Sequence, residues 1–510
     1  MLEQSWGEGY VVDVDYTTGF YRELTPALLR FVTLLGGVQA AGPDAPFVYH
    51  ELGCGNGYTT ALLAAANPGG RFFGVDFNPT HINNARKLAS DGGVGNASFV
   101  EKSFGELLEA DLPEAEFIAL HGVWSWVSEE NRRQIVEFVR RKLKPGGIFY
   151  VSYNSLPGLS QVAPLQRLLF DHSNLGGGER MERVRRSLDF ARRLEKAGAD
   201  YFRVNPLAKA RLASLDKHDP HYVAHEYYNS HWLPFYHADV ARDLAGAKLA
   251  YAGSAILMDN FEQFSLKPET AKLAAETGDR TMAETVKDFA RNQVFRKDVF
   301  TRGAPRAEPR ELETMLGRTR FALARPRSSC ALSRKTPAGD ISLHEDAHAP
   351  VLEALARGPA TFDERARAKE TAKLDRVRLR QSVFGLAAFG NVLPALPADG
   401  EDARRAAAAR FNRAMLAQPP AGQKNTVLAS PVIGSGVALN FLDRIFVHAP
   451  LDERGAVDYA RKAVAAKGMR LVKEGKPVES DAEAGAVIEE RARFFLAELL
   501  PFLRGLGVIE

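Results

Sequence analysis

The sequence predicts an α/β protein whose N-terminal part is a sheet of parallel strands with helices packed on it. The first observation is the stretch 48–76, which reads as a strand, a glycine-rich turn, a helix and a second strand that ends on Asp76. The second is a series of further apolar runs at 96–104, 117–127 and 148–152, separated by segments with helical spacing. Strands that alternate with helices are typical of parallel sheets, because each parallel connection needs a long crossover.

The predicted elements follow one another in a regular order. A helix is expected over 26–35, since its apolar residues fall on one face, and Gly36-Gly37 ends it. The first strand stops at Leu52, and the next helix covers 59–66 and breaks at the turn 67–70. Ser128 caps the helix that leads to the fifth strand. A helix over 238–247 and an apolar run at 249–257 could add a sixth strand, which would make 159–230 an insertion.

We expect the chain to contain four parts. Residues 1–158 form the sheet domain, which 238–266 could complete, and 159–305 form a mainly helical middle region that could act as a lid. Residues 306–345 are a connector. Residues 346–510 form a C-terminal α+β domain, in which three short helices and a strand suggest a winged-helix-like module. The stretch 381–389 of its third helix has no basic residue, which favours docking of a protein over binding of DNA.

The composition is that of a globular protein, with 45% hydrophobic and 25% charged residues. A net charge of +3 indicates no general attraction to nucleic acid or to anionic membranes. The two cysteines, Cys54 and Cys330, argue against a disulfide framework or a cysteine metal site. No signal peptide is visible, and no stretch approaches the roughly 20 apolar residues of a membrane span. We therefore expect a cytoplasmic protein without a membrane partner.

The turn after the first strand has the chemistry of a nucleoside-binding loop. Gly53 and Gly55 can adopt backbone angles closed to other residues and let a ligand lie against the main chain. Amide groups at the start of the next helix face such a ligand, and Asp76 is placed to accept hydrogen bonds from ribose hydroxyls. The spacing of Gly53, Gly55 and Gly57 differs from the dinucleotide motif G-x-G-x-x-G, which counts against a nicotinamide or flavin enzyme.

The run E-L-G-C-G-N-G at 51–57, followed by G-V-D at 74–76, resembles the cofactor motif of class I S-adenosylmethionine-dependent methyltransferases. The run L-K-P-G-G at 143–147 is a second feature similar to that family. The resemblance implies a Rossmann-like methyltransferase sheet, S-adenosylmethionine as cofactor and S-adenosylhomocysteine as product. It also implies that Glu51 and the glycine loop hold the methionine end, while Asp76 holds the ribose.

In the family, residues just past the third strand contact the adenine. Many members have Asp there, whereas this chain has Ser103, so recognition of the adenine edge would rest on Ser103 or on backbone groups. The cofactor-binding residues expected from the resemblance are Glu51, Gly53, Cys54, Gly55, Gly57, Asp76, Phe77, Ser103, Phe104 and His121.

A second resemblance concerns residues 221–303. H-E-Y-Y-N, W-L-P-F-Y and F-R-K-D-V-F-T-R-G are similar to the methyltransferase regulatory domain found behind bacterial class I methyltransferase domains. Proteins of this arrangement include the rickettsial-type protein lysine methyltransferases. The resemblance thus implies methyl transfer to lysine side chains of a protein substrate, with nucleic acid not expected as a partner.

The same stretch raises the question of a metal. His225-Glu226 opens like the zinc motif H-E-x-x-H, but Asn229 stands where the second histidine must be. We therefore expect no metal here, and a packed or substrate-facing surface instead.

Methyl transfer is an in-line displacement, and aromatic faces can hold a cation and an alkyl chain without competing hydrogen bonds. Packing of the core is the alternative for Trp124 and Tyr153, and packing is favoured for Phe20, Tyr21 and Trp126. No residue can be named as a general base. Ligands bind at the carboxyl ends of parallel strands, so the candidates for the substrate channel are Tyr16, His121, Trp124, Tyr153 and Asn154.

Two other functions stay open. The chain could be a small-molecule or nucleic-acid methyltransferase, although His121-Gly122-Val123-Trp124 after the fourth strand differs from the N-P-P-Y type of motif used on exocyclic amines of bases. It could also be a non-catalytic interaction protein whose methyltransferase domain senses the cofactor. The intact glycine loop and Asp76 argue against lost cofactor binding, but not against lost transfer.

Overall fold

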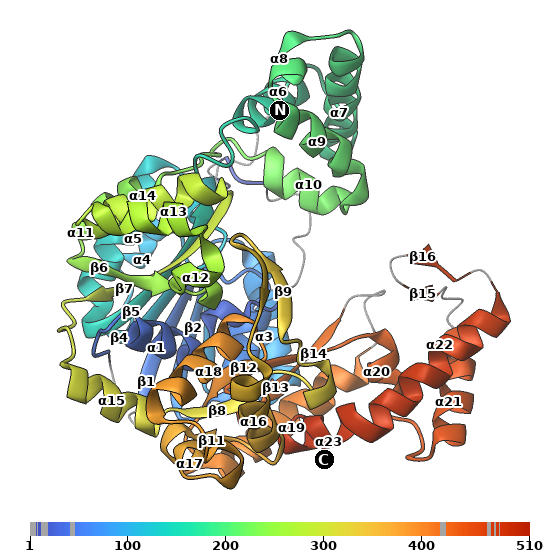
Figure 1. Ribbon diagram of the computed structural model, residues 1–510. Coiled ribbons are helices and arrows are strands. Elements are labelled where there is room, and N and C mark those ends of the chain that lie inside the picture. Colours follow the sequence, from blue (N-terminus) through green and yellow to red (C-terminus); the bar gives the residue numbers. More distant parts are fainter. Residues whose placement is uncertain are drawn as a thin grey trace.

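The N-terminal half of the protein is built on one seven-stranded sheet. The structure, a computed structural model, describes residues 7, 9–11, 19–40, 46–418, 425–466, 471–473, 476–478 and 480–510. The strand order is β3-β2-β1-β4-β5-β7-β6 (Figure 1). All pairings among β1 to β5 are parallel, whereas β7 pairs antiparallel with both β5 and β6. The strands are β1 (Phe47–Leu52), β2 (Gly70–Asp76), β3 (Ala97–Glu101), β4 (Ala115–Leu120), β5 (Leu143–Asn154), β6 (Leu249–Ser254) and β7 (Phe295–Arg302).

This sheet confirms the predicted α/β, Rossmann-like fold and the sixth strand. Helices cover both faces because successive residues of a strand point to opposite sides. In β4, Phe117 and Ala119 belong to one apolar core, while Ile118 and Leu120 belong to the other. The first core takes in α1 (Pro26–Leu35), α2 (Tyr58–Ala66) and α3 (Pro79–Asp91), and the second takes in α4 (Phe104–Leu107), α5 (Glu129–Lys142) and α11 (His237–Ala245).

The strand order places a ligand crevice at a defined point. β1 lies between β2 and β4, so the chain connections leave it in opposite directions along the sheet. In open α/β sheets, ligands bind outside the carboxyl ends of the strands at such a switch point. The glycine loop 53–57 follows β1 directly and therefore lies at this edge.

A separate helical unit rises between β5 and α11 (Figure 1). It has its own apolar core, which includes Leu165, Val184 and Leu212. Val11 of the N-terminal segment also packs into this core, and its amide donates a 2.8 Å hydrogen bond to the Asn229 side chain. The helices of the unit are α6 (Ala163–Ser173), α7 (Arg180–Lys196), α8 (Asp200–Val204), α9 (Pro206–Ser214) and α10 (Pro220–Tyr227).

The sheet takes in more of the chain than the expected limits of 1–158 and 238–266. β7 (Phe295–Arg302) lies within the stretch 159–305 that was expected to be a middle region, yet it is an inner strand between β5 and β6. The stretch therefore divides into the helical unit and a segment that completes the sheet. This segment crosses from β6 to β7 through α12 (Glu262–Ser265), α13 (Pro268–Glu276) and α14 (Arg280–Arg291).

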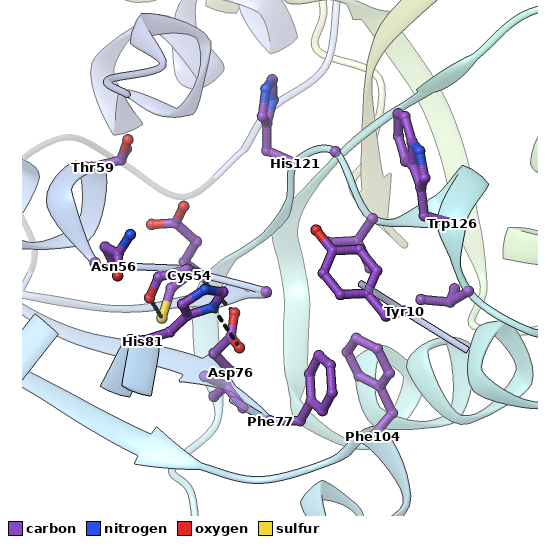
Figure 2. A pocket seen from close by; sticks show the side chains of 18 of the residues that line it. Tyr10, Cys54, Asn56, Thr59, Asp76, Phe77, His81, Phe104, His121 and Trp126 are labelled. Carbon is purple, nitrogen blue, oxygen red and sulfur yellow. Dashed lines mark hydrogen bonds and ion pairs between the residues drawn. The ribbon is translucent and has the colours of Figure 1, made fainter. Parts of the chain in front are cut away.

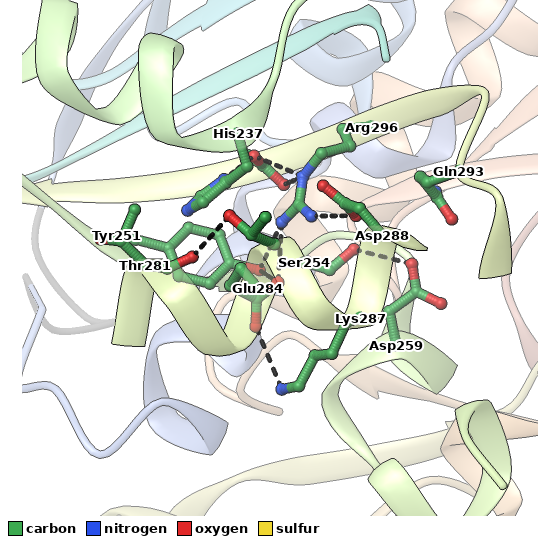
Figure 3. Close-up of polar contacts among 12 residues, drawn as sticks. His237, Tyr251, Ser254, Asp259, Thr281, Glu284, Lys287, Asp288, Gln293 and Arg296 are labelled. Carbon is green, nitrogen blue, oxygen red and sulfur yellow. Dashed lines mark hydrogen bonds and ion pairs between the residues drawn. The ribbon is translucent and has the colours of Figure 1, made fainter. Parts of the chain in front are cut away.

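A buried ionic network ties β7 to α14 (Figure 3). The Arg296 guanidinium is 3% exposed and donates to Asp298 at 2.9 and 3.0 Å, to Glu284 at 2.8 Å and to Asp288 at 2.5 Å. Burial opposes ionisation of Asp298, but the adjacent Arg296 cation holds the pKa of that carboxyl well below its usual range. Charged residues can thus occupy an inner strand because they neutralise one another.

The remaining residues form a C-terminal unit. β8 (Arg320–Leu323), from the expected connector, pairs antiparallel with β11 (Ala360–Thr361) and β12 (Val392–Ala395), so the connector is part of this unit. Along the chain, three helices follow β8 and precede β12: α16 (Glu345–Ala356), α17 (Phe362–Ala366) and α18 (Arg376–Ala388). The likeness of this unit to a winged helix stays a prediction. The other elements are α15 (Pro309–Arg318), β9 (Ser333–Thr336), β10 (Gly339–Ser342), α19 (Glu401–Ala417), β13 (Thr426–Ser430), β14 (Ser435–Leu439), α20 (Phe441–Phe446), α21 (Glu453–Ala466), β15 (Val472–Lys473), β16 (Lys476–Pro477), α22 (Asp481–Phe494), a π-helical turn (Phe495–Leu499) and α23 (Leu500–Gly505).

The C-terminal unit packs against the helix that follows the glycine loop. The hydroxyl of Tyr58, at the start of α2, donates to the backbone oxygen of Val427 at 2.6 Å. At the end of α2, the Asn67 amide donates to the backbone oxygen of Gly434 at 2.9 Å. Within the part of the chain that the structure describes, no helix is both long and apolar enough to cross a membrane.

Candidate functional site

A pocket opens at the carboxyl edge of the sheet, and the glycine loop forms one wall of it. Gly53, Gly55 and Gly57 all have positive φ, at +73°, +52° and +71°, which is the left-handed region that favours glycine. A Cβ atom at Gly53 would lie 2.5 Å from a methyl group of Val123, and one at Gly57 would lie 2.5 Å from the Cβ of Ala85. A Cβ at Gly55 would meet nothing within 4 Å. Two glycines are thus required by packing, whereas Gly55 leaves open space at the pocket wall.

Two carboxylates end the neighbouring strands β1 and β2 at this wall. Glu51 is 4% exposed and accepts a short hydrogen bond from the Thr60 hydroxyl. Burial, with a smaller contribution from the charge of Asp76, raises the pKa of Glu51 to about 7. Asp76 accepts hydrogen bonds at 2.9 Å from the amides of Gly55 and Asn78. Asp76 therefore holds the glycine loop 53–57 in place through the amide of Gly55.

Aromatic rings form the opposite wall. Figure 2 shows Tyr10, Phe77, Phe104 and Trp126 together on the side of the pocket away from Cys54. The rings of Tyr10 and Phe77 meet edge to face, with centroids 6.0 Å apart. Such a wall offers flat apolar surfaces to a planar ligand group.

A third wall comes from the end of β4. The ring of His121 lies against that of Tyr21, with centroids 3.8 Å apart and planes tilted by 33°, and its Nδ1 lies 2.8 Å from the hydroxyl of Tyr150. Burial lowers the pKa of His121 to about 3, with a small opposing effect of Glu23. The imidazole is therefore neutral at physiological pH and brings no positive charge to the pocket.

The ten residues expected to bind the cofactor all line this one pocket, so the structure brings the predicted set together. Ser103 differs in detail from the expectation. Its hydroxyl caps α4, accepting from the Glu106 amide at 3.3 Å and donating to the Glu106 carboxylate at 3.0 Å. A hydrogen bond from Ser103 to an adenine edge would have to compete with this cap.

Two of the residues predicted for the substrate channel, Trp124 and Tyr153, do not line the pocket. Trp124 is fully buried in the core beneath the pocket, against Phe235, and the expectation that it faces a substrate is wrong. Tyr153 is also fully buried, and its hydroxyl donates to Asp298 at 2.6 Å in the ionic network, so the same correction holds. Tyr153 points into the apolar layer under β5 because residues of a strand alternate between its faces. Trp124 belongs to the 3-10 turn Trp124–Trp126 after β4 and is buried in the same layer. Tyr16 lies outside the described residues.

Tyr21 and Trp126 were expected to pack, and both do so while also lining the pocket. Tyr21 is partly buried against the first core, and Trp126 is 8% exposed in the core of the helical unit. Tyr10 and His81 were missed entirely. His81 lies one turn into α3, with its Nδ1 3.3 Å from Asp76, and the N-cap at Asn78 could have placed it near that carboxylate.

The motif that opens like a zinc site has a structural explanation. Asn229 donates to the backbone oxygen of His225, and its side-chain oxygen accepts from the amide of Val11, so it ties the end of α10 to the N-terminal segment. Among the described residues, no group of three or more His, Cys, Asp or Glu side chains could hold a metal ion.

Comparison with known proteins adds a family context. Residues 50–149 match the family model described as a methyltransferase domain, and residues 219–302 match the model described as a predicted methyltransferase regulatory domain. The uncharacterized protein sll1526 from Synechocystis sp. is 36% identical over 504 residues, which are 99% of this chain and 100% of that protein. The uncharacterized protein RP789 from Rickettsia prowazekii is 26% identical over 299 residues, which are 57% of this chain and 53% of that protein.

A solved structure agrees over almost the whole length. PKMT2 from Rickettsia typhi, in complex with AdoHcy (S-adenosylhomocysteine), is similar over 97% of this chain and 99% of that one, with a TM-score of 0.69 and 19% sequence identity. At this identity the likeness shows the fold. Its coverage means that the helical unit and the C-terminal unit are shared along with the sheet.

Proposed function

We propose that this chain, which belongs to the class I S-adenosylmethionine-dependent methyltransferases with a methyltransferase regulatory domain, transfers methyl groups to lysine side chains of a protein. The observation that carries the lysine part of the proposal is the agreement in fold with Rickettsia typhi PKMT2 over nearly the whole chain. The resemblance of residues 221–303 to the rickettsial-type protein lysine methyltransferases supports the same acceptor.

The pocket fits S-adenosylmethionine on three counts. Gly55 leaves open space where any other residue would place a Cβ atom, so a ligand can approach the main chain. The carboxylates of Glu51 and Asp76 suit an amino group and ribose hydroxyls, respectively. The wall of Tyr10, Phe77 and Phe104 suits an adenine ring. We assign the methionine end to Glu51, the ribose to Asp76 and the base to the aromatic wall.

Bound S-adenosylmethionine supplies an electrophilic methyl group on a positively charged sulfur. The contribution of the protein is to align the acceptor nitrogen with that methyl group and to exclude water. Tyr21 offers an aromatic face to a cation or an alkyl chain, and the neutral ring of His121 beside it adds no like charge. An acceptor lysine must arrive neutral, and both burial and a neighbouring cation lower the pKa of its ammonium group.

Methyl-labelled S-adenosylmethionine tests the proposal directly. The protein is incubated with the labelled cofactor and a bacterial lysate, and the label is measured separately in protein, RNA and small molecules. We expect label in protein, and none above background with the Asp76→Ala variant. Label in RNA or in small molecules would replace the proposed acceptor with one of those classes. Tight cofactor binding without any transfer would identify a cofactor-sensing protein.

A further inference from the structure

A third carboxylate, that of Glu226, lies in the helical unit near the aromatic wall of the pocket. Glu226 belongs to α10, and its neighbour His225 contacts the ring of Tyr10 with centroids 5.8 Å apart. Tyr10 itself lines the cofactor pocket. Glu226 is partly exposed, although protein atoms surround its carboxylate on most sides. The charge of Glu226 also acts on the hydroxyl of Tyr10, so Glu226 lies close to a ring that lines the donor pocket.

The groups around Glu226 tie it to the same edge of the sheet. Asn154, the last residue of β5, is 4% exposed and lies beside the Glu226 carboxylate, where its hydrogen bonding lowers the pKa of that carboxyl. The side-chain nitrogen of Asn154 is buried and makes no other hydrogen bond of regular geometry with the residues that the structure describes. Tyr222, on the same helix, is within electrostatic reach of both Glu226 and Tyr21. The residues around Glu226 thus reach as far as Tyr21, whose ring lies against that of His121.

Among the residues that the structure describes, the carboxylate of Glu226 makes no salt bridge, unlike Asp298 and Glu284, which pair with Arg296. Arg211 faces it from α9 and partly offsets its burial, but the Arg211 guanidinium donates to the hydroxyl of Tyr227. Burial raises the pKa of Glu226 to about 7. An unpaired carboxylate in such a place is costly, and costs of this kind are typical of sites that await a ligand.

We propose that Glu226 receives the ammonium group of the acceptor lysine and takes a proton from it, an inference that rests on the proposed function. The acceptor side chain would pass between the helical unit and the carboxyl edge of the sheet, along the rings of Tyr10, Tyr21 and Tyr222. Asn154 would hold the carboxylate in place.

The proton and electron balance of the step is simple. One proton passes from the lysine ammonium to a Glu226 oxygen, which leaves a neutral amine with a free lone pair. The amine nitrogen forms a bond to the donor methyl carbon while the carbon–sulfur bond breaks and its electron pair stays on sulfur. The product is a methylammonium group, and Glu226 returns its proton to solvent.

The test uses the full chain saturated with S-adenosylhomocysteine and two short probes. One probe is acetyl-Gly-Lys-Gly-amide, and the other carries norleucine in place of lysine, which removes only the ammonium group. Binding is measured calorimetrically for the wild type, for Glu226→Gln and for Glu182→Gln. Glu182, on α7 of the same helical unit, is 59% exposed and 3.9 Å from its partner Arg186, so its substitution makes the same charge change away from the site.

We expect the wild type and Glu182→Gln to bind the lysine probe at least about tenfold more tightly than the norleucine probe, and Glu226→Gln to lose this preference. All three proteins should bind S-adenosylhomocysteine equally. With a lysate as acceptor, Glu226→Gln should lower methyl transfer by about 100-fold, which is typical of removing a general base.

Three results would overturn the inference: no preference for lysine in the wild type, a preference that survives in Glu226→Gln, or a loss of S-adenosylhomocysteine binding in that variant. These differ from a failure of the proposed function. If the label is on lysine and Glu226→Gln keeps full activity, only the role of Glu226 is refuted. If the binding preference for lysine depends on Glu226 but the label is in RNA, the protein acceptor is refuted and Glu226 remains a site for an ammonium group.

Discussion

Replacing Arg296 by methionine tests the ionic network that makes β7 an inner strand. The guanidinium is 3% exposed and is shared by three carboxylates, of which Asp298 is 1%, Asp288 2% and Glu284 10% exposed. Methionine has a similar length and lacks the charge. The variant therefore leaves these carboxylates buried without the cation that neutralises them, while adding little steric conflict.

The expected cost is large for a single substitution. Removing one partner of a buried ion pair destabilises a protein by about 3–5 kcal/mol. At about 2–4 °C per kcal/mol for a domain of this size, the unfolding temperature should fall by about 6–20 °C. The pH dependence has a definite sign. Arg296 holds the pKa of Asp298 low, whereas burial by itself raises it. Without Arg296 the buried carboxyl therefore takes up a proton at a higher pH than in the wild type, and protonation removes the unpaired charge. The difference in unfolding temperature between variant and wild type should therefore narrow from pH 7.5 to pH 5.

Thermal unfolding followed by circular dichroism at pH 7.5 and pH 5 measures both effects. Arg133→Met is the matched control, because Arg133 is 73% exposed and its partner Glu129 is 71% exposed. An exposed pair of this kind contributes at most about 1 kcal/mol. If Arg296→Met unfolded within a degree of Arg133→Met, the network would not be what stabilises the antiparallel edge of the sheet.

Three further predictions concern the pocket and its surroundings. Because burial, and then Asp76, raise the pKa of Glu51 to about 7, the affinity for S-adenosylhomocysteine should be full above pH 7 and fall below it; Glu51→Gln should bind at least about tenfold more weakly at pH 8 and show no such pH dependence by calorimetry. Gly55→Val should weaken S-adenosylhomocysteine binding more than it lowers the unfolding temperature, whereas Gly57→Val should mainly lower that temperature, since its Cβ would lie 2.5 Å from Ala85; equal effects of the two variants on binding and unfolding would contradict this. Glu226→Gln should stabilise the protein at pH 8 by up to about 3 kcal/mol, because burial raises the pKa of this carboxyl from 4.5 to about 7. The gain should vanish near pH 4, where the wild-type carboxyl is protonated. A variant less stable than the wild type at pH 8 would contradict the unpaired state of the Glu226 carboxylate.

The cofactor half of the pocket could be predicted from the sequence because its signals are local. Glu51, Gly55 and Asp76 lie within one strand–turn–helix–strand unit, and the spacing of that unit fixes their positions relative to one another. The helix predicted over 26–35 is α1 with the same bounds, for the same reason.

The other half of the pocket depends on contacts between distant parts of the chain. Tyr10 reaches the pocket because Val11 packs into the core of the helical unit, and Glu226 belongs to that unit although it lies far along the sequence. No local pattern predicts such contacts. Trp124 lies only two residues from Trp126, and both rings are buried. A sequence cannot tell which of two neighbouring rings a turn also presents to the pocket.

β7 escaped prediction for a different reason. Its sequence, F-R-K-D-V-F-T-R, has three charged residues in a row after Phe295 and reads like a surface segment. In the fold, Arg296 and Asp298 are buried together and neutralise each other, and Lys297 pairs with Glu23 on the other face. Charge alone therefore gave the wrong location for this strand.

The most direct test of the proposed lysine acceptor is the chemical identity of the methylated residue. Protein labelled by this enzyme with methyl-labelled S-adenosylmethionine is hydrolysed to amino acids, and the label is separated by chromatography against standards. The account predicts that the label elutes with Nε-methylated lysines and is absent when Asp76→Ala replaces the wild type. Label that elutes with methylated arginine, methylated histidine or carboxyl methyl esters would contradict it.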